Sequence, residues 1–306
     1  SIGEDGLVQE RQADYINPYL ALGRVNSVVQ ARRPISEISP MLFGNMPRDG
    51  GAFVLNGEEK AAVLNQYPEI SKFICPYLGS EQMIQGKPRW CIWIDDNNAE
   101  YAQQHPYLKT VLERVRDVRL ASAASSTRDF AARPHRFVQI AGTAKKHSLA
   151  VAKVSSERRA YLPVDLLDGN SIVSDLLFAL YDAPLWNMAL IASRLHLVWV
   201  ATVCGKMKTD FRYSNTIGWN TFPVPKLTEK NKDDLTKCAQ EILLSRERHY
   251  PQTIAELYLL ESMPDDLQLA HSLNDEVLER IYIGRRFKND TERLERLFEM
   301  YSKMSG

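Results

Sequence analysis

Charged and aromatic side chains alternate along one stretch of the chain, Lys206-Met207-Lys208-Thr209-Asp210-Phe211-Arg212-Tyr213. An extended backbone would send Lys208, Asp210 and Arg212 to one face, and Phe211 and Tyr213 to the other. Lys or Arg suits the acceptor edge of guanine, and Asp suits the exocyclic amine of the paired cytosine. The Lys208 and Asp210 pair could therefore read one G·C pair in a major groove. An exposed surface ion pair gives the same alternation, and the residues alone leave both interpretations open.

Two short motifs resemble catalytic signatures. Ile16-Asn17-Pro18-Tyr19 is similar to the Asn-Pro-Pro-Tyr loop that holds a flipped adenine in amino-methyltransferases, but one proline is missing. No glycine-rich cofactor loop after a strand accompanies it, which favours a turn before Leu20. Asp49 with Glu58 and Lys60 resembles the acidic-acidic-lysine metal site of nucleases. Because Glu58 also suits the first turn of a helix, a metal-dependent nuclease is the less favoured interpretation.

Histidines and cysteines form no pattern typical of catalysis, zinc binding or a disulfide framework. The histidines are scattered through the chain: His105, His135, His147, His196, His249 and His271. The cysteines form no CxxC pair: Cys75, Cys91, Cys204 and Cys238. This usage fits a protein of the reducing cytoplasm.

Hydropathy predicts neither a membrane span nor a signal peptide. The most apolar stretch, residues 185–204, contains Asn187, Arg194 and His196, which would be costly in lipid. Residues 1–14 are polar and acidic and have no apolar core, so we expect a linker there.

Charge is concentrated in one block, although the formal net charge of the chain is zero. Residues 101–160 contain twelve basic and four acidic residues. Electrostatic fields act locally, so such a block suits a face that binds a polyanion. A solvated helix face is the alternative.

Sequence periodicity predicts a mixed first part and a helical second part. Asn56 to Glu59 indicates the start of a helix that continues to Gln66, and Arg89 to Asp95 is typical of a strand. Apolar residues at helical spacing predict one helix from Tyr107 to Ala132, with Arg114, Arg116, Arg119 and Arg128 on its surface, and another from Leu185 toward Gly205. Further strands are expected at 137–142, 148–155 and 161–167, and further helices at 235–249, 264–283 and 290–304.

Several groups of residues resemble, in order and spacing, the target-recognition region of MmeI-like type II restriction-modification enzymes. These groups are Val154 to Pro163, Gly205 to Tyr213, Ser214 to Ile217 and Asn220 to Pro223. Phe43 to Pro47, Asp49 to Gly51, Ala270-His271 and Leu297-Phe298 extend the resemblance over nearly the whole chain. Gly218-Trp219 departs from the more usual β-branched and aromatic pair, so the local packing there is expected to differ.

After Phe222-Pro223-Val224-Pro225 the composition becomes charged and helical, which places a domain boundary there. Together with the resemblance, this predicts a mixed α/β (α+β) target-recognition domain over residues 1–225 and an all-α C-terminal helical domain over residues 226–306. The C-terminal domain is expected to clasp DNA or to brace the recognition fold. The parent enzyme would be a bacterial adenine-specific DNA methyltransferase that uses S-adenosylmethionine and often carries a nuclease domain. Both catalytic domains would precede residue 1. This fragment would hold no catalytic residue, metal or cofactor of its own, and its partners would be double-stranded DNA and the upstream methyltransferase domain.

The resemblance also assigns base-reading positions: Lys208 with Asp210, Lys153 with Asp175, and Leu176 with Arg212. Hydroxyl and guanidinium groups are common phosphate ligands, so the run from Ser155 to Arg159 is predicted to contact the DNA backbone through Ser155, Ser156, Arg158 and Arg159. Lys145, Lys146 and Arg128 of the basic block are predicted to join them. A protein-interaction module whose helical tail docks a partner subunit remains the other alternative.

Overall fold

The computed structural model describes residues 15–19, 27–207, 210–259 and 261–305. The chain forms two compact units: unit 1 comprises residues 1–41, 151–165 and 183–306, and unit 2 comprises residues 42–150 and 166–182. Strands and helices alternate up to about residue 221, and the described residues from 229 to 305 form helices. The predicted fold class, a mixed α/β region followed by a helical one, is therefore confirmed. The predicted domain boundary after residue 225 stays a prediction.

Unit 2 contains two small sheets. The first has the order β1-β9-β5-β7, and the second has the order β2-β4-β3-β8. Their strands are β1 Leu42–Phe43, β2 Val54–Leu55, β3 Ile74–Leu78, β4 Trp90–Ile92, β5 His147–Ala152, β7 Val164–Asp168, β8 Ile172–Val173 and β9 Leu177–Tyr181. The chain passes from one unit to the other within β5 and again within β7.

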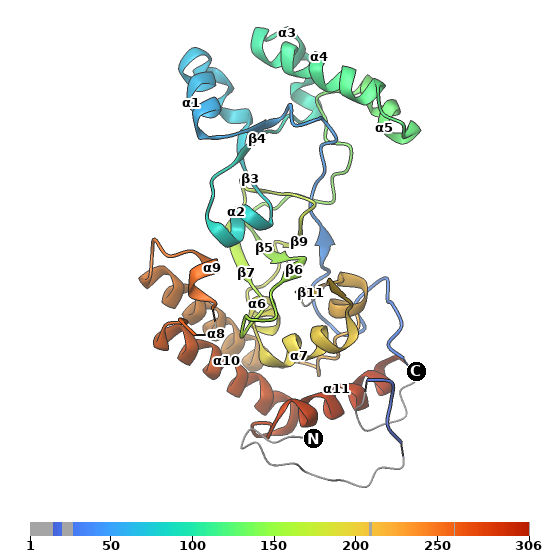
Figure 1. The fold of residues 1–306 in the computed structure, drawn as a ribbon, viewed down its shortest axis with the longest axis vertical. Coiled ribbons are helices and arrows are strands. Elements are labelled where there is room, and N and C mark those ends of the chain that lie inside the picture. Colours follow the sequence, from blue (N-terminus) through green and yellow to red (C-terminus); the bar gives the residue numbers. More distant parts are fainter. Residues whose placement is uncertain (1–14, 20–26, 208–209, 260, 306) are drawn as a thin grey trace. The chain divides into compact units, whose positions relative to one another are not determined.

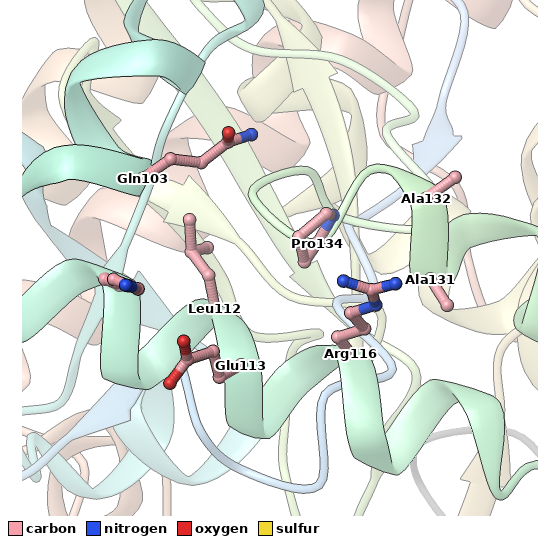
Figure 2. A pocket seen from close by; sticks show the side chains of 8 residues that line it. Gln103, Leu112, Glu113, Arg116, Ala131, Ala132 and Pro134 are labelled. Atoms are coloured by element: carbon pink, nitrogen blue, oxygen red, sulfur yellow. The ribbon is translucent and has the colours of Figure 1, made fainter.

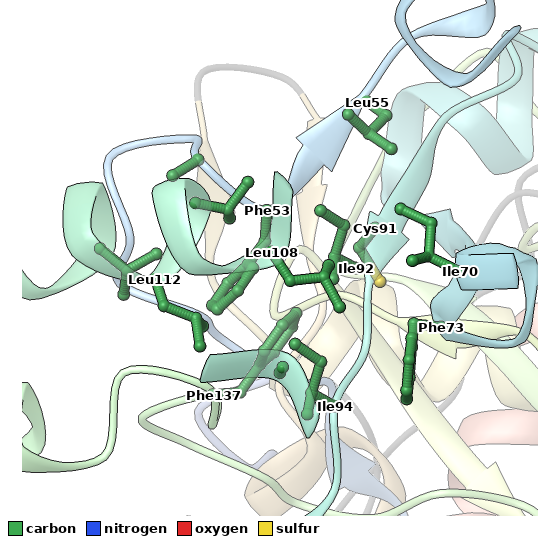
Figure 3. Packing of buried hydrophobic residues seen from close by; sticks show 14 of the residues in the cluster. Phe53, Leu55, Ile70, Phe73, Cys91, Ile92, Ile94, Leu108, Leu112 and Phe137 are labelled. Atoms are coloured by element: carbon green, nitrogen blue, oxygen red, sulfur yellow. The ribbon is translucent and has the colours of Figure 1, made fainter. Parts of the chain in front are cut away.

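Short helices surround the second sheet (Figure 1): α1 Gly57–Gln66, η1 Pro68–Phe73, α2 Ser80–Gln85, η2 Asp96–Asn98, α3 Ala99–Gln104, α4 Pro106–Leu120, α5 Ser125–Asp129 and η3 Phe130–Ala132. The predicted start of α1 is confirmed, because Asn56 and Glu59 form a reciprocal capping box. Figure 3 shows the core between these elements, in which Phe53 and Phe137 stack at 5.7 Å beside Ile92 and Leu108.

The helix predicted from Tyr107 to Ala132 is wrong in its second half, because α4 ends at Leu120 and α5 begins only at Ser125. The Ser122 hydroxyl accepts a hydrogen bond from the Ala124 N–H at 3.3 Å. Short hydroxyl side chains compete in this way with helical backbone bonds. Ser122, between the two helices, is the residue from which this break could have been predicted.

A strand does not form over residues 137–142, contrary to prediction. Only Gln139 pairs there, in an isolated bridge with Met46. The buried Asn45 side chain takes up the neighbouring backbone: it accepts from the Ala141 N–H at 2.8 Å and donates to the Gly142 carbonyl at 2.9 Å. A side chain far away in sequence thus replaces the expected strand partner.

Unit 1 is built on helices. They are α6 Trp186–Ile191, α7 Arg194–Val203, α8 Glu229–Arg248, α9 Ile254–Leu257, α10 Asp265–Ile283 and α11 Asp290–Ser305, with a π-helical turn at Asn215–Trp219. Helices α8 and α10 pack side by side, α8 also packs on α6, and α11 packs on α7 (Figure 1). The three predicted C-terminal helices are confirmed, although α8 begins six residues before the predicted Leu235.

One apolar stripe was predicted to be a single helix from Leu185 toward Gly205, but Ser193 divides it into α6 and α7. The Ser193 hydroxyl donates to the Leu190 carbonyl at 2.7 Å and accepts from the His196 N–H at 3.1 Å. It thereby ends one helix and caps the next. The apolar residues of both helices are buried, as predicted.

Candidate nucleic-acid interface

The predicted strand from Lys206 to Tyr213 is a hairpin in the structure. Strand β10 (Lys206–Met207) pairs antiparallel with β11 (Asp210–Arg212), which also pairs with β6 (Val154–Ser155). Arg212 lies opposite Val154, and Phe211 lies opposite Ser155. Because side chains alternate along a strand, Asp210 and Arg212 share one face and Phe211 takes the other.

Tyr213 anchors this small sheet in the core. Its hydroxyl bonds to the ring of the buried His196 at 2.8 Å, and its backbone N–H donates to the Lys153 carbonyl at 2.8 Å. Gly218 makes room for it, since a Cβ there would lie 2.5 Å from the Tyr213 ring. Trp219 is fully buried and donates to the Ser39 carbonyl at 2.8 Å. The departure at Gly218-Trp219 therefore serves the packing of Tyr213.

Lys208 falls outside the described residues, so its pairing with Asp210 stays a prediction. Asp210 also acts on Arg159: burial lowers the pKa of Arg159, and the Asp210 carboxylate partly opposes that effect. Arg212 is exposed, and Lys153 is half-buried immediately before β6.

The run from Ser155 to Arg159 leaves β6 as a tight turn. The Ser156 hydroxyl accepts from the Arg158 N–H at 3.3 Å, and the Ser156 carbonyl accepts from the Arg159 N–H at 3.2 Å. Arg158 is exposed, while Ser155 is buried and its hydroxyl accepts from Arg159 at 3.5 Å. The turn therefore presents Arg158 to solvent and keeps Arg159 against the small sheet.

Asp175 and Leu176 form a firmly held turn between β8 and β9 in unit 2. The Asp175 N–H donates to the Asn45 carbonyl at 3.1 Å, and the Leu176 carbonyl accepts from Ser80 at 2.9 Å. Leu176 is 52% exposed, so it is accessible for the predicted contact. Lys153 and Arg212, their predicted partners, belong to unit 1, so both pairings stay predictions.

Gly44 and Asn45 of the Phe43 to Pro47 motif explain why this turn is rigid. A Cβ on Gly44 would lie within 1.9 Å of the Ser174 carbonyl oxygen, so only glycine permits this approach. Asn45 is fully buried and also donates to the Val173 carbonyl at 3.2 Å.

Lys145 and Lys146 expose their side chains from a turn whose backbone is fixed. Their N–H groups donate to the Asp182 carboxylate at 2.9 and 2.7 Å. These backbone hydrogen bonds lower the pKa of Asp182, and the bond from Lys145 has the largest effect. Arg128 is exposed as well, but one of its guanidinium nitrogens donates to the carbonyls of Ser122 and Ala123.

Arg119 does not belong to the exposed basic block, so the prediction that it lies on the helix surface is wrong. It is fully buried, and its guanidinium donates to five carbonyl oxygens. These belong to Pro47, Arg48, Phe130, Arg133 and Arg136. Burial lowers the pKa of Arg119 to about 10. The burial of Arg119 could have been predicted from periodicity, because residue 119 continues the apolar stripe of Leu112 and Val115.

Arg116 lines a surface pocket of about 340 Å³ beside α4 (Figure 2). Lys109, Glu113 and Gln103 also line it, so basic, acidic and neutral groups meet there. No sequence pattern had indicated this pocket.

The two catalytic-looking motifs have structural roles. The Asn17 side chain accepts from the Tyr19 N–H at 2.9 Å, which confirms the predicted turn. Asp49 is buried and accepts from the N–H groups of Gly51 and Phe53, while Lys60 lies over the Trp90 ring at 4.2 Å. In the part of the chain that the structure describes, no three His, Cys, Asp or Glu side chains are grouped as metal ligands would be.

All four cysteines are free, and across the described ranges no helix combines the length and apolar character needed to cross a membrane.

Comparison with known proteins shows that the chain is similar to parts of a DNA methyltransferase and of a restriction-modification enzyme. It is 35% identical over 290 residues to DNA methyltransferase A of Bacillus subtilis (strain 168), covering 95% of this chain and 33% of that protein. It also matches the structure of the type IIL restriction-modification enzyme MmeI in complex with DNA, with a TM-score of 0.88 and 30% identity over 96% of this chain and 39% of that one. The chain thus spans well under half the length of either relative.

The chain belongs to the MmeI family. The MmeI target recognition domain matches residues 23–226, and the MmeI C-terminal domain matches residues 227–306. The resemblance identified from the sequence motifs is confirmed.

Proposed function

We propose that this chain is the DNA-reading portion of a larger adenine-specific DNA methyltransferase of the restriction-modification type. The observation that carries the proposal is its match to the MmeI target recognition domain, joined to surface turns that expose charged side chains on fixed backbones. Arg158, Lys145 and Lys146 suit phosphate contact, and Ser156 and Arg128 extend the same chemistry. Arg159 and Ser155, which are less exposed, would support the turn that carries Arg158.

Base reading is proposed for Asp210 and Arg212 on their shared face of β11, and for Lys208, Lys153, Asp175 and Leu176. Charged groups placed at a base edge discriminate donors from acceptors, which phosphate contacts cannot do. Sequence preference would therefore come from these residues, and affinity from the phosphate contacts.

The methyl group would come from S-adenosylmethionine bound by a catalytic domain upstream in the parent protein. The residues described here do not fit that cofactor, since Asn17 is engaged in its own turn and none of the described strands leads into a glycine-rich loop. No step of methyl transfer is assigned to this chain.

The test exchanges the charges of one proposed base-reading pair. Lys208→Glu combined with Asp210→Arg in the parent enzyme should change the required base from G to C at one position of the recognition sequence. Methylation protection of a plasmid library measures the recognised sequence before and after the exchange. An unchanged recognition sequence in an active variant would refute the assignment.

A second measurement separates DNA reading from the protein-interaction alternative. Binding of this chain to a labelled duplex should weaken steeply with salt, because each neutralised phosphate releases counterions. Failure to bind duplex DNA at any salt concentration would favour the alternative.

A further inference from the structure

A buried polar network in unit 1 ties the segment after the Ser155 to Arg159 run to the C-terminal helices. Tyr161 lies two residues beyond that run, and its hydroxyl donates to the Asp275 carboxylate of α10 at 2.8 Å. Its ring stacks on the buried His271, also of α10, with centroids 4.0 Å apart. Asp275 in turn accepts from the Arg194 N–H at the start of α7 at 2.7 Å. The Tyr161 side chain therefore contacts α10, and its partner Asp275 links α10 to the start of α7.

Arg246 of α8 provides a second attachment. Its guanidinium donates to the Val164 carbonyl at 2.9 Å and to the Asp165 carboxylate at 2.6 Å. The arginine side chain is only 11% exposed, so this ion pair is largely shielded from water. Paired and hydrogen-bonded buried charges are satisfied in one arrangement only.

His271 links Tyr161 to Tyr258, which in turn interacts with Arg246. The His271 ring bonds to the Tyr258 hydroxyl at 2.9 Å and to the Ala192 carbonyl at 3.0 Å. The backbone of Leu259, next to Tyr258, forms an antiparallel bridge with Arg159. Arg158 itself borders a hollow of about 760 Å³ together with Leu259, Glu261 and Ser262. Residues of the connection between α9 (Ile254–Leu257) and α10 thus contact Arg159 and lie beside Arg158.

We infer that Tyr161, Arg246, His271 and Asp275 are positioning residues for DNA reading. They hold the exit of the Ser155 to Arg159 turn, while the pairing of β6 with β11 holds its entrance. A turn fixed at both ends presents Arg158 in one place without losing conformational entropy on binding. On this inference, which rests on the proposed function, the C-terminal helices brace the recognition fold.

The test compares two variants of unit 1, each of which lacks one buried tyrosine hydroxyl. Tyr161→Phe deletes the bond to Asp275, and the control Tyr282→Phe deletes a buried bond from α10 to the Pro223 carbonyl, also 2.8 Å long. Both variants should lose similar thermal stability. Affinity for a labelled mixed-sequence DNA duplex should fall about fivefold in Tyr161→Phe only. The slope of log affinity against log salt should fall by about one phosphate contact.

Two further measurements distinguish positioning from general destabilisation. Adding Tyr161→Phe to Arg158→Ala should cause no further loss of affinity, because the residue being positioned is gone. Without DNA, trypsin should cut after Arg158 faster in Tyr161→Phe than in the wild type or Tyr282→Phe.

Each failure has a separate meaning. If the wild type does not bind the duplex, the proposed function falls and this inference falls with it. If the wild type binds while Tyr161→Phe matches Tyr282→Phe in affinity, salt slope and trypsin cleavage, only the inference is overturned.

Discussion

Arg119 and Arg114 occupy the same helix and the same basic block, yet only Arg114 is exposed. Two of the five carbonyls that Arg119 binds, those of Phe130 and Arg133, also accept from backbone N–H groups. For the carbonyls of Pro47, Arg48 and Arg136, the Arg119 guanidinium supplies the donor. A guanidinium suits this task because it presents five N–H donors in a fixed plane. Counting charges along the sequence could not separate the two arginines, whereas the apolar stripe could.

Replacing Arg119 by Met should destabilise the protein by about 3–5 kcal/mol, because it leaves buried carbonyls unpaired. Arg119→Lys should also destabilise, since an ammonium cannot reach all five oxygens. Urea unfolding measures both, with Arg114→Met as the exposed control, expected within about 0.5 kcal/mol of wild type. Equal stability of Arg119→Met and Arg114→Met would contradict the assigned role.

Among the elements, those with local signals could be predicted from the sequence. Capping at Asn56, acidic residues at the start of α10 and apolar periodicity in α11 each specify an element by themselves. The errors occur where a distant or competing side chain decides. Asn45 takes up the backbone at residues 141–142, and Ser193 divides a continuous apolar stripe.

Helix α8 shows how a cap sets the start of an element. Thr228 forms a capping box with Asn231 in place of the more familiar Glu or Gln, so the sequence pattern was missed. Thr228→Ala should lower stability by about 1 kcal/mol. Thr236→Ala on the same helix should change it by less than about 0.5 kcal/mol or raise it, because Thr236 bonds back to Lys232 inside the helix. Thermal unfolding of the two variants decides, and the reverse order would show that the cap does not matter.

At the scale of the whole molecule, the sequence could predict the composition of the two regions but not how the chain is shared between the units. Residues 151–165 leave unit 2 and join the C-terminal helices, a long-range arrangement without a local signal. The same limit applies to the candidate site. Charged residues could be named from the motifs. Tyr161 and His271 also lie in motifs, but nothing in the sequence indicated their contacts with each other and with Asp275.

Buried titratable groups couple the stability of unit 1 to pH in opposite directions. Burial lowers the pKa of His196 and of His271 to about 3, so both stay neutral when folded and take up protons on unfolding below about pH 6.5. Their contribution is lost as pH falls. Burial raises the pKa of Asp275 to about 6, so the folded state holds a proton that the unfolded state releases above about pH 4. That contribution is lost as pH rises.

Asp275→Asn isolates the second effect, because asparagine keeps the shape and cannot ionise. The stability of the variant relative to wild type should rise by about 1.4 kcal/mol per pH unit between about pH 4 and 6, and level off above. All other titrating groups cancel in the difference, including both histidines. Urea unfolding of the two proteins at half-unit steps from pH 4 to 7.5 measures this difference in stability. The control is Asp265→Asn, on the exposed first turn of α10. A difference that stays flat with pH would mean that Asp275 is already ionised in the folded protein at pH 4, and that its bond to Tyr161 joins a hydroxyl to a carboxylate throughout this range.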